Sequence, residues 1–225
     1  VLYMVSNDGE INDVEDLKER TIYLTGKGTS PDIVLQYLLE ANGISTDEVT
    51  LEYKTEATEV AAVLAAEEQQ GNAAVGVLPQ PFVTAACAQN ENLQVVLDLT
   101  KEWEKVQQDG SSLVTGVTVA TKAFIEEHPA AVEAFLADHG NSVTYVNENV
   151  DQAAKWAVEK GIIAKEPIAR KAIPDCNVVC ITGDEMKQAL TGYFRTLYEA
   201  NPQVVGNPST PPDDALWDDL YYGAE

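Results

Sequence analysis

The amino-acid sequence predicts an α/β protein whose sheet is largely parallel. Through residues 1–97, short apolar runs typical of strands alternate with longer stretches of helical periodicity. Glycine, proline and asparagine stand where these segments meet, which marks the turns between them. From residue 123 onward the pattern is helical almost throughout. We therefore expect a sheet with crossover helices in the first half and a helical second half.

The first strands and helices follow from local signals. Residues 1–5 and 21–25 have the apolar pattern of strands, and residues 14–19 form a short helix after a turn at residues 7–9. A longer helix follows the second strand. Ser30 fits its N-cap, Pro31 its first helical position and Asp32 its positive first turn.

The rest of the chain continues the pattern. Predicted strands are residues 50–53, 74–78, 93–97 and 113–121, and predicted helices are residues 58–69, 82–88, 123–128, 130–146, 150–159, 167–172, 184–200 and 213–222. Residues 100–112 are expected to form a charged loop, and residues 178–181 a short extended segment. The helices of the second half have apolar faces but no predicted sheet on which to pack.

Charge and hydropathy exclude several classes of partner. The formal net charge is −23, from 37 acidic and 14 basic residues. The phosphates of nucleic acids and an anionic membrane surface would both be repelled. No stretch approaches the roughly 20 apolar residues of a membrane span, and no signal peptide is recognisable. Because the sequence opens within a strand pattern and lacks an initiator methionine, we expect the natural protein to begin upstream.

Metal, cofactor and nucleotide motifs are missing from the sequence. The three cysteines do not form a disulfide framework, and Cys176 and Cys180 are expected to be half-buried thiols rather than a disulfide. Cys87 is interpreted as a small core residue. Both histidines, His128 and His139, have the pattern of helix-end residues, so we expect neither a metal nor another cofactor. The glycines near Lys27 match neither the phosphate-loop nor the dinucleotide pattern.

An ordered set of segments resembles a known family of binding proteins. Residues 11–18 resemble its "s-v-a-D-L-k" helix start, and residues 25–30 resemble its glycine-serine ligand loop. Residues 57–78 resemble a helix and strand of the family, residues 79–82 its "d-P-y" turn, and residues 121–136 its "F-l-e-e-n-P" helix. The family is the nitrate/taurine/sulfonate/bicarbonate group of ABC-transporter substrate-binding proteins, related to the thiamine-precursor binding proteins.

The resemblance implies a type II periplasmic binding protein fold, with two lobes joined by crossing hinge strands. Residues 8–112 would form lobe 2, and residues 1–7 and 113–225 the remainder of an incomplete lobe 1. The implied partners are a small-molecule solute, polar or anionic, held between the lobes and the permease of an ABC transporter, with no nucleic acid. The implied location is extracytoplasmic, as a periplasmic protein or a lipoprotein anchored through a missing N-terminal segment.

The same resemblance points to candidate ligand-binding residues in loops that follow strands. Gly28, Thr29 and Ser30 lie at a strand-to-helix turn, where amides and hydroxyls favour an anion. The alternative is an ordinary N-cap, and Asp32 counts against a strongly anionic ligand.

Two further loops supply the remaining candidates. Gln80 and Phe82 suit a small polar or heteroaromatic ligand, although Phe82 could instead be a core residue. Thr55 is a contact candidate or a helix cap.

Three functions remain open at this stage. The first is the solute-binding component of an ABC importer, with no catalytic residues. The second is an enzyme on the same fold, of the dehydratase or pyrimidine synthase type, although the cysteine-rich motif of that synthase is missing here. The third is a relative that has lost its ligand site and assembles through an exposed surface.

Overall fold

The computed structural model describes residues 1–212 and 215–224. The chain forms two compact units, one made of Val1–Val114 with Thr182–Glu225 and the other of Thr115–Ile181. The lobe boundaries expected from the resemblance stay a prediction. Part of the predicted helix at residues 213–222 lies outside the described residues, and Ala215–Leu220 forms the 3-10 helix η5.

The first unit is built on a five-stranded mixed sheet in the order β3-β2-β4-β1-β5. Its strands are β1 (Leu2–Ser6), β2 (Thr21–Thr25), β3 (Thr50–Lys54), β4 (Val75–Pro79) and β5 (Gln94–Asp98). Strand β2 runs parallel to β3 and β4, whereas β1 runs antiparallel to β4 and β5. The expectation of a largely parallel sheet was therefore wrong at β1. An apolar run predicts a buried strand but carries no information on its direction.

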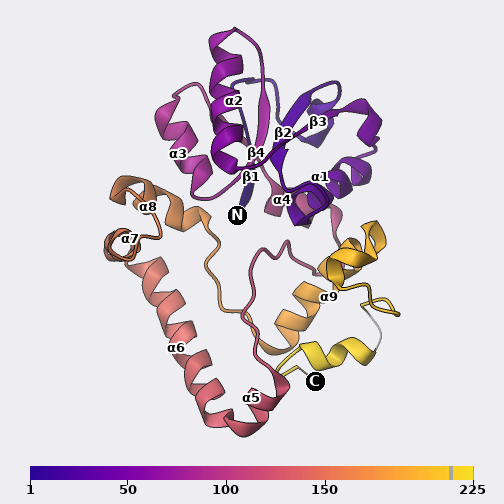
Figure 1. The fold of residues 1–225 in the computed structure, drawn as a ribbon, viewed down its shortest axis with the longest axis vertical. Helices are drawn as coiled ribbons and strands as arrows, with labels where there is room; N and C mark the ends of the chain where they lie inside the picture. Colours follow the sequence, from indigo (N-terminus) through magenta and orange to yellow (C-terminus); the bar gives the residue numbers. More distant parts are fainter. Residues whose placement is uncertain (213–214, 225) are drawn as a thin grey trace. The chain divides into compact units, whose positions relative to one another are not determined.

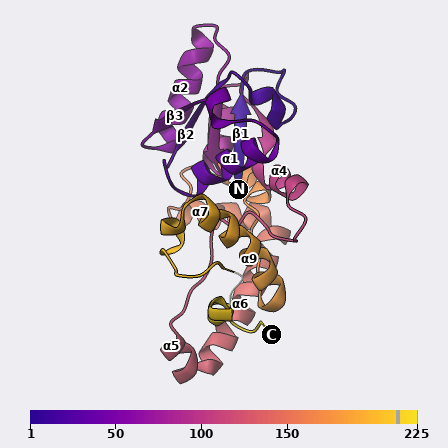
Figure 2. The same ribbon diagram turned by 90° about the vertical axis from the view of Figure 1, so that its right-hand side faces the viewer.

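Helices cover both faces of this sheet, as Figures 1 and 2 show. The helices α1 (Ser30–Ala41) and α4 (Leu99–Val106) pack on one face, and α2 (Ala57–Gln69) and α3 (Phe82–Gln89) on the other. Alternate strand residues separate the two layers: Met4 faces α1 and α4, whereas Val5 faces α2 and α3. The predicted α/β architecture is confirmed.

Helix α9 (Gly183–Ala200) completes the core of the first unit by packing on α1. Its Tyr193 and Leu197 are buried in the same cluster as Trp103 of α4, which is 0% exposed. The Trp103 ring lies between Tyr37, with ring centroids 5.1 Å apart, and Tyr193, at 5.6 Å. A segment far along the sequence thus supplies part of the first core.

The expectation of a loop at residues 100–112 was wrong for its first half. Asp98 accepts a hydrogen bond from the Thr100 amide at 3.0 Å and so caps the amino end of α4. Leu99 and Trp103, four residues apart, then share the buried face of this helix. The many charged residues of this stretch obscured its short apolar face.

The second unit consists of short and long helices. These are α5 (Lys122–Glu127), α6 (Pro129–Glu148), α7 (Val150–Glu159) and α8 (Glu166–Ala172), close to the predicted ranges. Its buried cluster is small and contains Ala153, Ala154, Ala169 and Ile173. Large apolar side chains such as Phe135, Trp156 and Ile162 are 44–73% exposed.

The two extended segments expected in the second half are not strands. Residues 113–121 and 178–181 have irregular backbone in the structure. A strand needs a neighbour to accept and donate its backbone hydrogen bonds, and all five strands of the described chain pair in the sheet of the first unit.

The remaining short elements are the 3-10 helices η1 (Val14–Leu17), η2 (Thr46–Glu48), η3 (Ile173–Asp175) and η4 (Pro202–Val205). Cys176 and Cys180 are partly buried thiols that form no disulfide, as expected, and burial raises the pKa of the Cys176 thiol. Cys87 was expected to be a core residue and is partly buried, packed against the core. Over the part of the chain that the structure describes, none of the helices has the length and apolar character needed to span a bilayer. Among the same residues, no cluster of His, Cys, Asp or Glu has the arrangement of a metal site.

Candidate ligand-binding site

One edge of the sheet gathers the loops in which the candidate residues lie. The parallel strands β2, β3 and β4 all end at this edge. Strand β5 also ends there and β1 begins there, because Leu2 pairs with Pro79 and Tyr3 with Asp98. We call it the carboxyl edge. In open α/β sheets, ligands bind beyond the carboxyl ends of strands.

The fold brings all the predicted site residues to this edge. Gly28, Thr29 and Ser30 follow β2, Thr55 follows β3, and Gln80 and Phe82 follow β4. Contact of any of them with a ligand stays a prediction. The six residues nevertheless lie in three loops that follow adjacent strands at the same edge of the sheet.

The loop between β2 and α1 is folded on itself. Gly26 and Gly28 both have positive φ, 75° and 74°, which glycine adopts without strain. The Thr29 amide donates to the Gly26 carbonyl at 2.8 Å, and the Thr29 hydroxyl donates to the same oxygen at 2.5 Å. Helix α1 begins at Ser30, so Thr29 rather than the expected Ser30 is the N-cap residue.

Asp32 holds the amino end of α1 from within the protein. Its side chain is buried, with the residue only 2% exposed. One carboxylate oxygen accepts from the Gly28 amide at 2.7 Å. The other accepts from the side-chain amide of Gln36 at 2.7 Å and from the Tyr53 hydroxyl at 2.8 Å. These charge-assisted bonds compensate the burial of a carboxylate.

Tyr53 of β3 links Asp32 to the surface. Burial, followed by the hydrogen bond to the Asp32 carboxylate, raises the pKa of Tyr53 to about 12. The exposed Lys27 ammonium lies over the Tyr53 ring, 5.1 Å from its centroid. The phenol therefore stays protonated at neutral pH and keeps donating to Asp32.

The two neighbouring loops are also closed by side chains. The Thr55 amide donates to a carboxylate oxygen of Glu59 at 2.8 Å, across the amino end of α2. The Gln80 side-chain oxygen accepts from the Thr84 hydroxyl at 2.9 Å and from its amide at 3.3 Å. Phe82 is 39% exposed at the start of α3, so its ring is accessible at this edge.

A fourth strand-to-helix junction at this edge was not predicted from the sequence. Strand β5 ends at Asp98 and α4 begins at Leu99 with no loop between them, so Asp98 and Thr100 flank the junction. Among the described residues, the Thr100 hydroxyl oxygen is buried and has no hydrogen-bond partner. The sequence could have predicted this helix start, because an Asp directly after an apolar run is a common N-cap. It was not considered because residues 100–112 were expected to form a loop.

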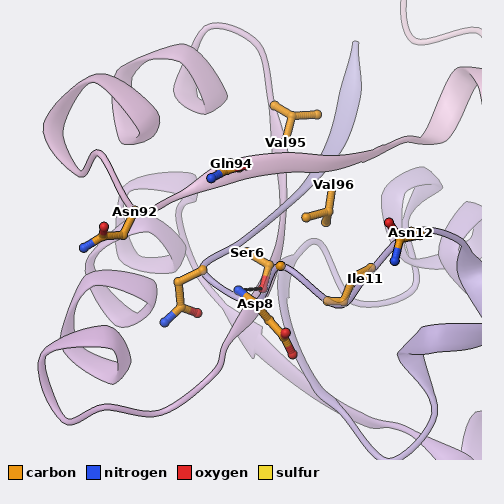
Figure 3. Close-up of a pocket in the computed structure, with 10 residues that line it drawn as sticks. Ser6, Asp8, Ile11, Asn12, Asn92, Gln94, Val95 and Val96 are labelled. Carbon is orange, nitrogen blue, oxygen red and sulfur yellow. Dashed lines mark hydrogen bonds between the residues drawn. The ribbon is translucent and has the colours of Figure 1, made fainter.

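A separate hollow of about 300 Å³ opens at the opposite edge, where β1 ends and β5 begins (Figure 3). In Figure 3 Ser6, Asp8 and Asn12 approach it from β1 and the following turn, and Gln94, Val95 and Val96 from β5. None of the predicted site residues lines it.

Ser6 and Asp8, which line the hollow, form hydrogen bonds and an ion pair with other groups of the protein. The Ser6 hydroxyl donates to the Ala74 carbonyl at 2.7 Å and accepts from the Asp8 amide at 2.9 Å. The Asp8 carboxylate pairs with the Arg20 guanidinium at 2.6 Å. These contacts fix the turn after β1, so we interpret the hollow as part of the scaffold.

Comparison with known proteins agrees with the fold. The sequence profile of the NMT1/THI5-like family matches residues 1–153. The chain belongs to this family. No curated protein sequence matches it at a significant level.

Solved structures of binding proteins share the architecture of this family member. An ABC transporter structure from Parabacteroides distasonis has a TM-score of 0.69 and 24% identity, with 95% of this chain and 68% of that one covered. The periplasmic aliphatic sulphonate binding protein SsuA from Escherichia coli has a TM-score of 0.71 and 19% identity, with 98% and 70% covered. The chain therefore has the mixed α/β fold of periplasmic binding proteins.

An enzyme shares the fold as well. The desulfurization enzyme DszB has a TM-score of 0.56 and 12% identity, with 98% of this chain and 73% of that one covered. At such identities the likeness concerns the fold alone.

Proposed function

We propose that this protein is the solute-binding component of an ABC importer and holds a small polar solute at the carboxyl edge. Membership of the NMT1/THI5-like family supports the proposal, as do structural neighbours described as an ABC transporter and a periplasmic binding protein. The proposed partner is the permease of the transporter. The proposed location is outside the cytoplasmic membrane, in the periplasm or as a surface lipoprotein.

The observation that carries the proposal is the convergence of loops at the carboxyl edge. Residues predicted separately as ligand contacts, among them Thr55, Gln80 and Phe82, follow three strands that end side by side. The exposed Phe82 ring and the Lys27 ammonium offer an apolar surface and a positive charge within these loops. A small polar solute with an apolar part fits such a combination.

The test is a direct search for a carried solute. Native mass spectrometry of freshly purified protein should show a bound small molecule, which fragmentation then identifies. Titration of the identified solute into Phe82→Ala should show a Kd about fivefold weaker, because an aromatic contact contributes roughly 1 kcal/mol. Val95→Ala is the matched control, since Val95 is 48% exposed in the hollow at the other edge.

Two results would contradict the proposal. A protein that carries no small molecule and binds none from a solute library would not be a solute-binding component. A solute whose affinity falls with Val95→Ala but not with Phe82→Ala would move the site to the hollow at the opposite edge.

The fold shared with DszB favours an enzyme as the second candidate function. Incubation of the identified solute with stoichiometric protein separates the two functions. A binding protein returns the solute unchanged after denaturation, whereas an enzyme returns a product that mass spectrometry detects.

A further inference from the structure

Four helices begin at the carboxyl edge, and near the amino end of each one a side-chain oxygen, here called its capping group, accepts a hydrogen bond from a backbone amide. At α1 the Asp32 carboxylate accepts from the Gly28 amide at 2.7 Å. At α2 the Glu59 carboxylate accepts from the Thr55 amide at 2.8 Å. In both cases the bonded amide lies just before the N-cap residue, and the carboxylate belongs to the first turn of the helix, where its negative charge offsets the positive potential of the helix end.

A side-chain oxygen also accepts from a backbone amide near the amino ends of α3 and α4. At α3 the Gln80 side-chain oxygen accepts from the Thr84 amide at 3.3 Å. At α4 the Asp98 carboxylate accepts from the Thr100 amide at 3.0 Å. Three of the four capping groups are carboxylates, so the edge carries negative charge where helix ends alone would present positive potential.

Asp32 is the least able of these groups to give way to an anionic solute. It is 2% exposed and accepts three hydrogen bonds, from Gly28, Gln36 and Tyr53. Moving it out would break all three bonds and leave their donors unsatisfied. A second negative charge beside it would be repelled through a medium of low dielectric constant.

The hydroxyl groups of the same loop are engaged within the protein. The Thr29 hydroxyl donates to the Gly26 carbonyl at 2.5 Å. The Ser30 side chain shares a hydrogen bond with the phenol of Tyr193 on α9. An oxyanion would have to displace these bonds as well as the carboxylate.

The basic residues of the edge only partly offset this charge. Lys54 lies 3.9 Å from the Glu52 carboxylate, and Lys101 lies 3.7 Å from that of Asp98. Lys27 stacks over the Tyr53 ring, whose hydroxyl donates to Asp32. The net charge of −23 adds a repulsive field for any approaching anion.

We infer that the carboxyl edge selects against anionic solutes, so the group that the solute presents to it is neutral or positively charged. The inference rests on the proposed function and narrows the class of solute. It separates this chain from fold neighbours described as sulfonate-binding proteins, whose ligands are anions.

The test uses three probes of the same size and different charge: benzoate, benzamide and benzamidine. Each is titrated into the full chain while the backbone amide signals of Gly28, Thr55 and Thr84 are followed by NMR. We expect benzamide or benzamidine to shift these signals with an affinity at least about tenfold higher than that of benzoate. The combined variant Asp32→Asn, Glu59→Gln and Asp98→Asn should reduce this discrimination to within about threefold.

The matched control is Asp13→Asn, Asp16→Asn and Glu48→Gln. These residues cap η1 and η2, which precede β2 and β3 at the opposite edge, and their replacement removes the same charge. The control should keep the discrimination of the wild type. A control that loses discrimination equally would assign the effect to net charge and overturn the role of the capping groups.

The wild-type titration decides the inference even if the combined variant does not fold. Equal or tighter binding of benzoate at these amides would overturn the charge selection while leaving the solute-binding function intact. If none of the three probes shifted these amides but the solute identified by mass spectrometry shifted those of the hollow instead, the site assignment and the inference would both fail.

Discussion

The two compact units of this protein differ in how their apolar residues are used. The first buries large side chains on both faces of its sheet, with Met4, Leu64 and Trp103 all 0% exposed. The second, residues 115–181, has a core of mostly alanine and leaves aromatic side chains such as Phe135 and Trp156 in solvent. The first unit should therefore be the more stable one, and the same type of substitution should destabilise it more than the second unit.

The largest contrast is expected between two tryptophans. Trp103→Ala should destabilise the protein by about 3–5 kcal/mol, because it removes a ring buried between Tyr37 and Tyr193. Trp156→Ala should cost about 1 kcal/mol or less, because Trp156 is 44% exposed and its ring stacks on the partly exposed Tyr145. Urea unfolding followed by circular dichroism measures both. Equal destabilisation by the two substitutions would contradict the proposed difference in stability between the two units.

Two helical glycines give the next contrast, and it changes sign between the units. A Cβ at Gly192 of α9 would lie 2.5 Å from the Cβ of Ser111, so Gly192→Ala should destabilise by about 1–3 kcal/mol. A Cβ at Gly140 of α6 would meet only the Cys180 sulfur at 3.9 Å. Gly140→Ala should therefore stabilise by about 0.5–1 kcal/mol.

Thermal unfolding of the two glycine variants reports the sign directly. The expected result is a lower Tm for Gly192→Ala and a higher Tm of the transition that contains α6 for Gly140→Ala. A lower Tm for both would show that α6 is packed as tightly as α9.

The smallest difference predicted between the two units concerns a single hydroxyl group, that of Tyr53. Tyr53→Phe removes a hydrogen bond to the buried Asp32 carboxylate and should cost about 1–2 kcal/mol at pH 7. The corresponding control in the second unit is Tyr145→Phe, which should have no measurable effect because Tyr145 is 41% exposed.

The same hydroxyl predicts a dependence on pH. The folded protein keeps the Tyr53 phenol protonated up to its pKa of about 12, whereas the unfolded chain releases that proton near pH 10. Between these values the unfolded state binds fewer protons, so stability falls as pH rises. Urea unfolding at several pH values should show a steeper loss in the wild type than in Tyr53→Phe. If the free energy of unfolding fell equally steeply with pH in both proteins, Tyr53 would not be the cause of the pH dependence.

The sequence predicted the elements that local patterns specify. The strands β2 and β4 and the helix α1 were found because an apolar run, a proline at the helix start and a glycine after its end act within a few residues. The long helix α6 was found for the same reason. The family and the periplasmic binding protein fold followed from the order of such segments.

What the sequence did not predict depends on contacts between distant residues. The direction of β1 is set by its partners β4 and β5, and no residue of the strand encodes it. Residues 113–121 have a strand-like alternation but no pairing partner among the described residues. The capping of the loops by Asp32 and Glu59 could be anticipated only in part, since Asp32 was noted as an anion at the helix start but its burial was not.

The position of β1 bears on the order in which the protein can fold during synthesis. This strand is synthesised well before both of its partners, Val75–Pro79 and Gln94–Asp98. Its five buried residues cannot enter the sheet until β4 has emerged, and their pairing is complete only with β5. Tyr193 of α9, which completes the core, is made later still. At the usual rate of about 5–20 residues per second, the chain spends several seconds without its complete core. During this delay the apolar side chains of β1 have no sheet in which to pack, so they stay accessible to chaperones and to other apolar surfaces.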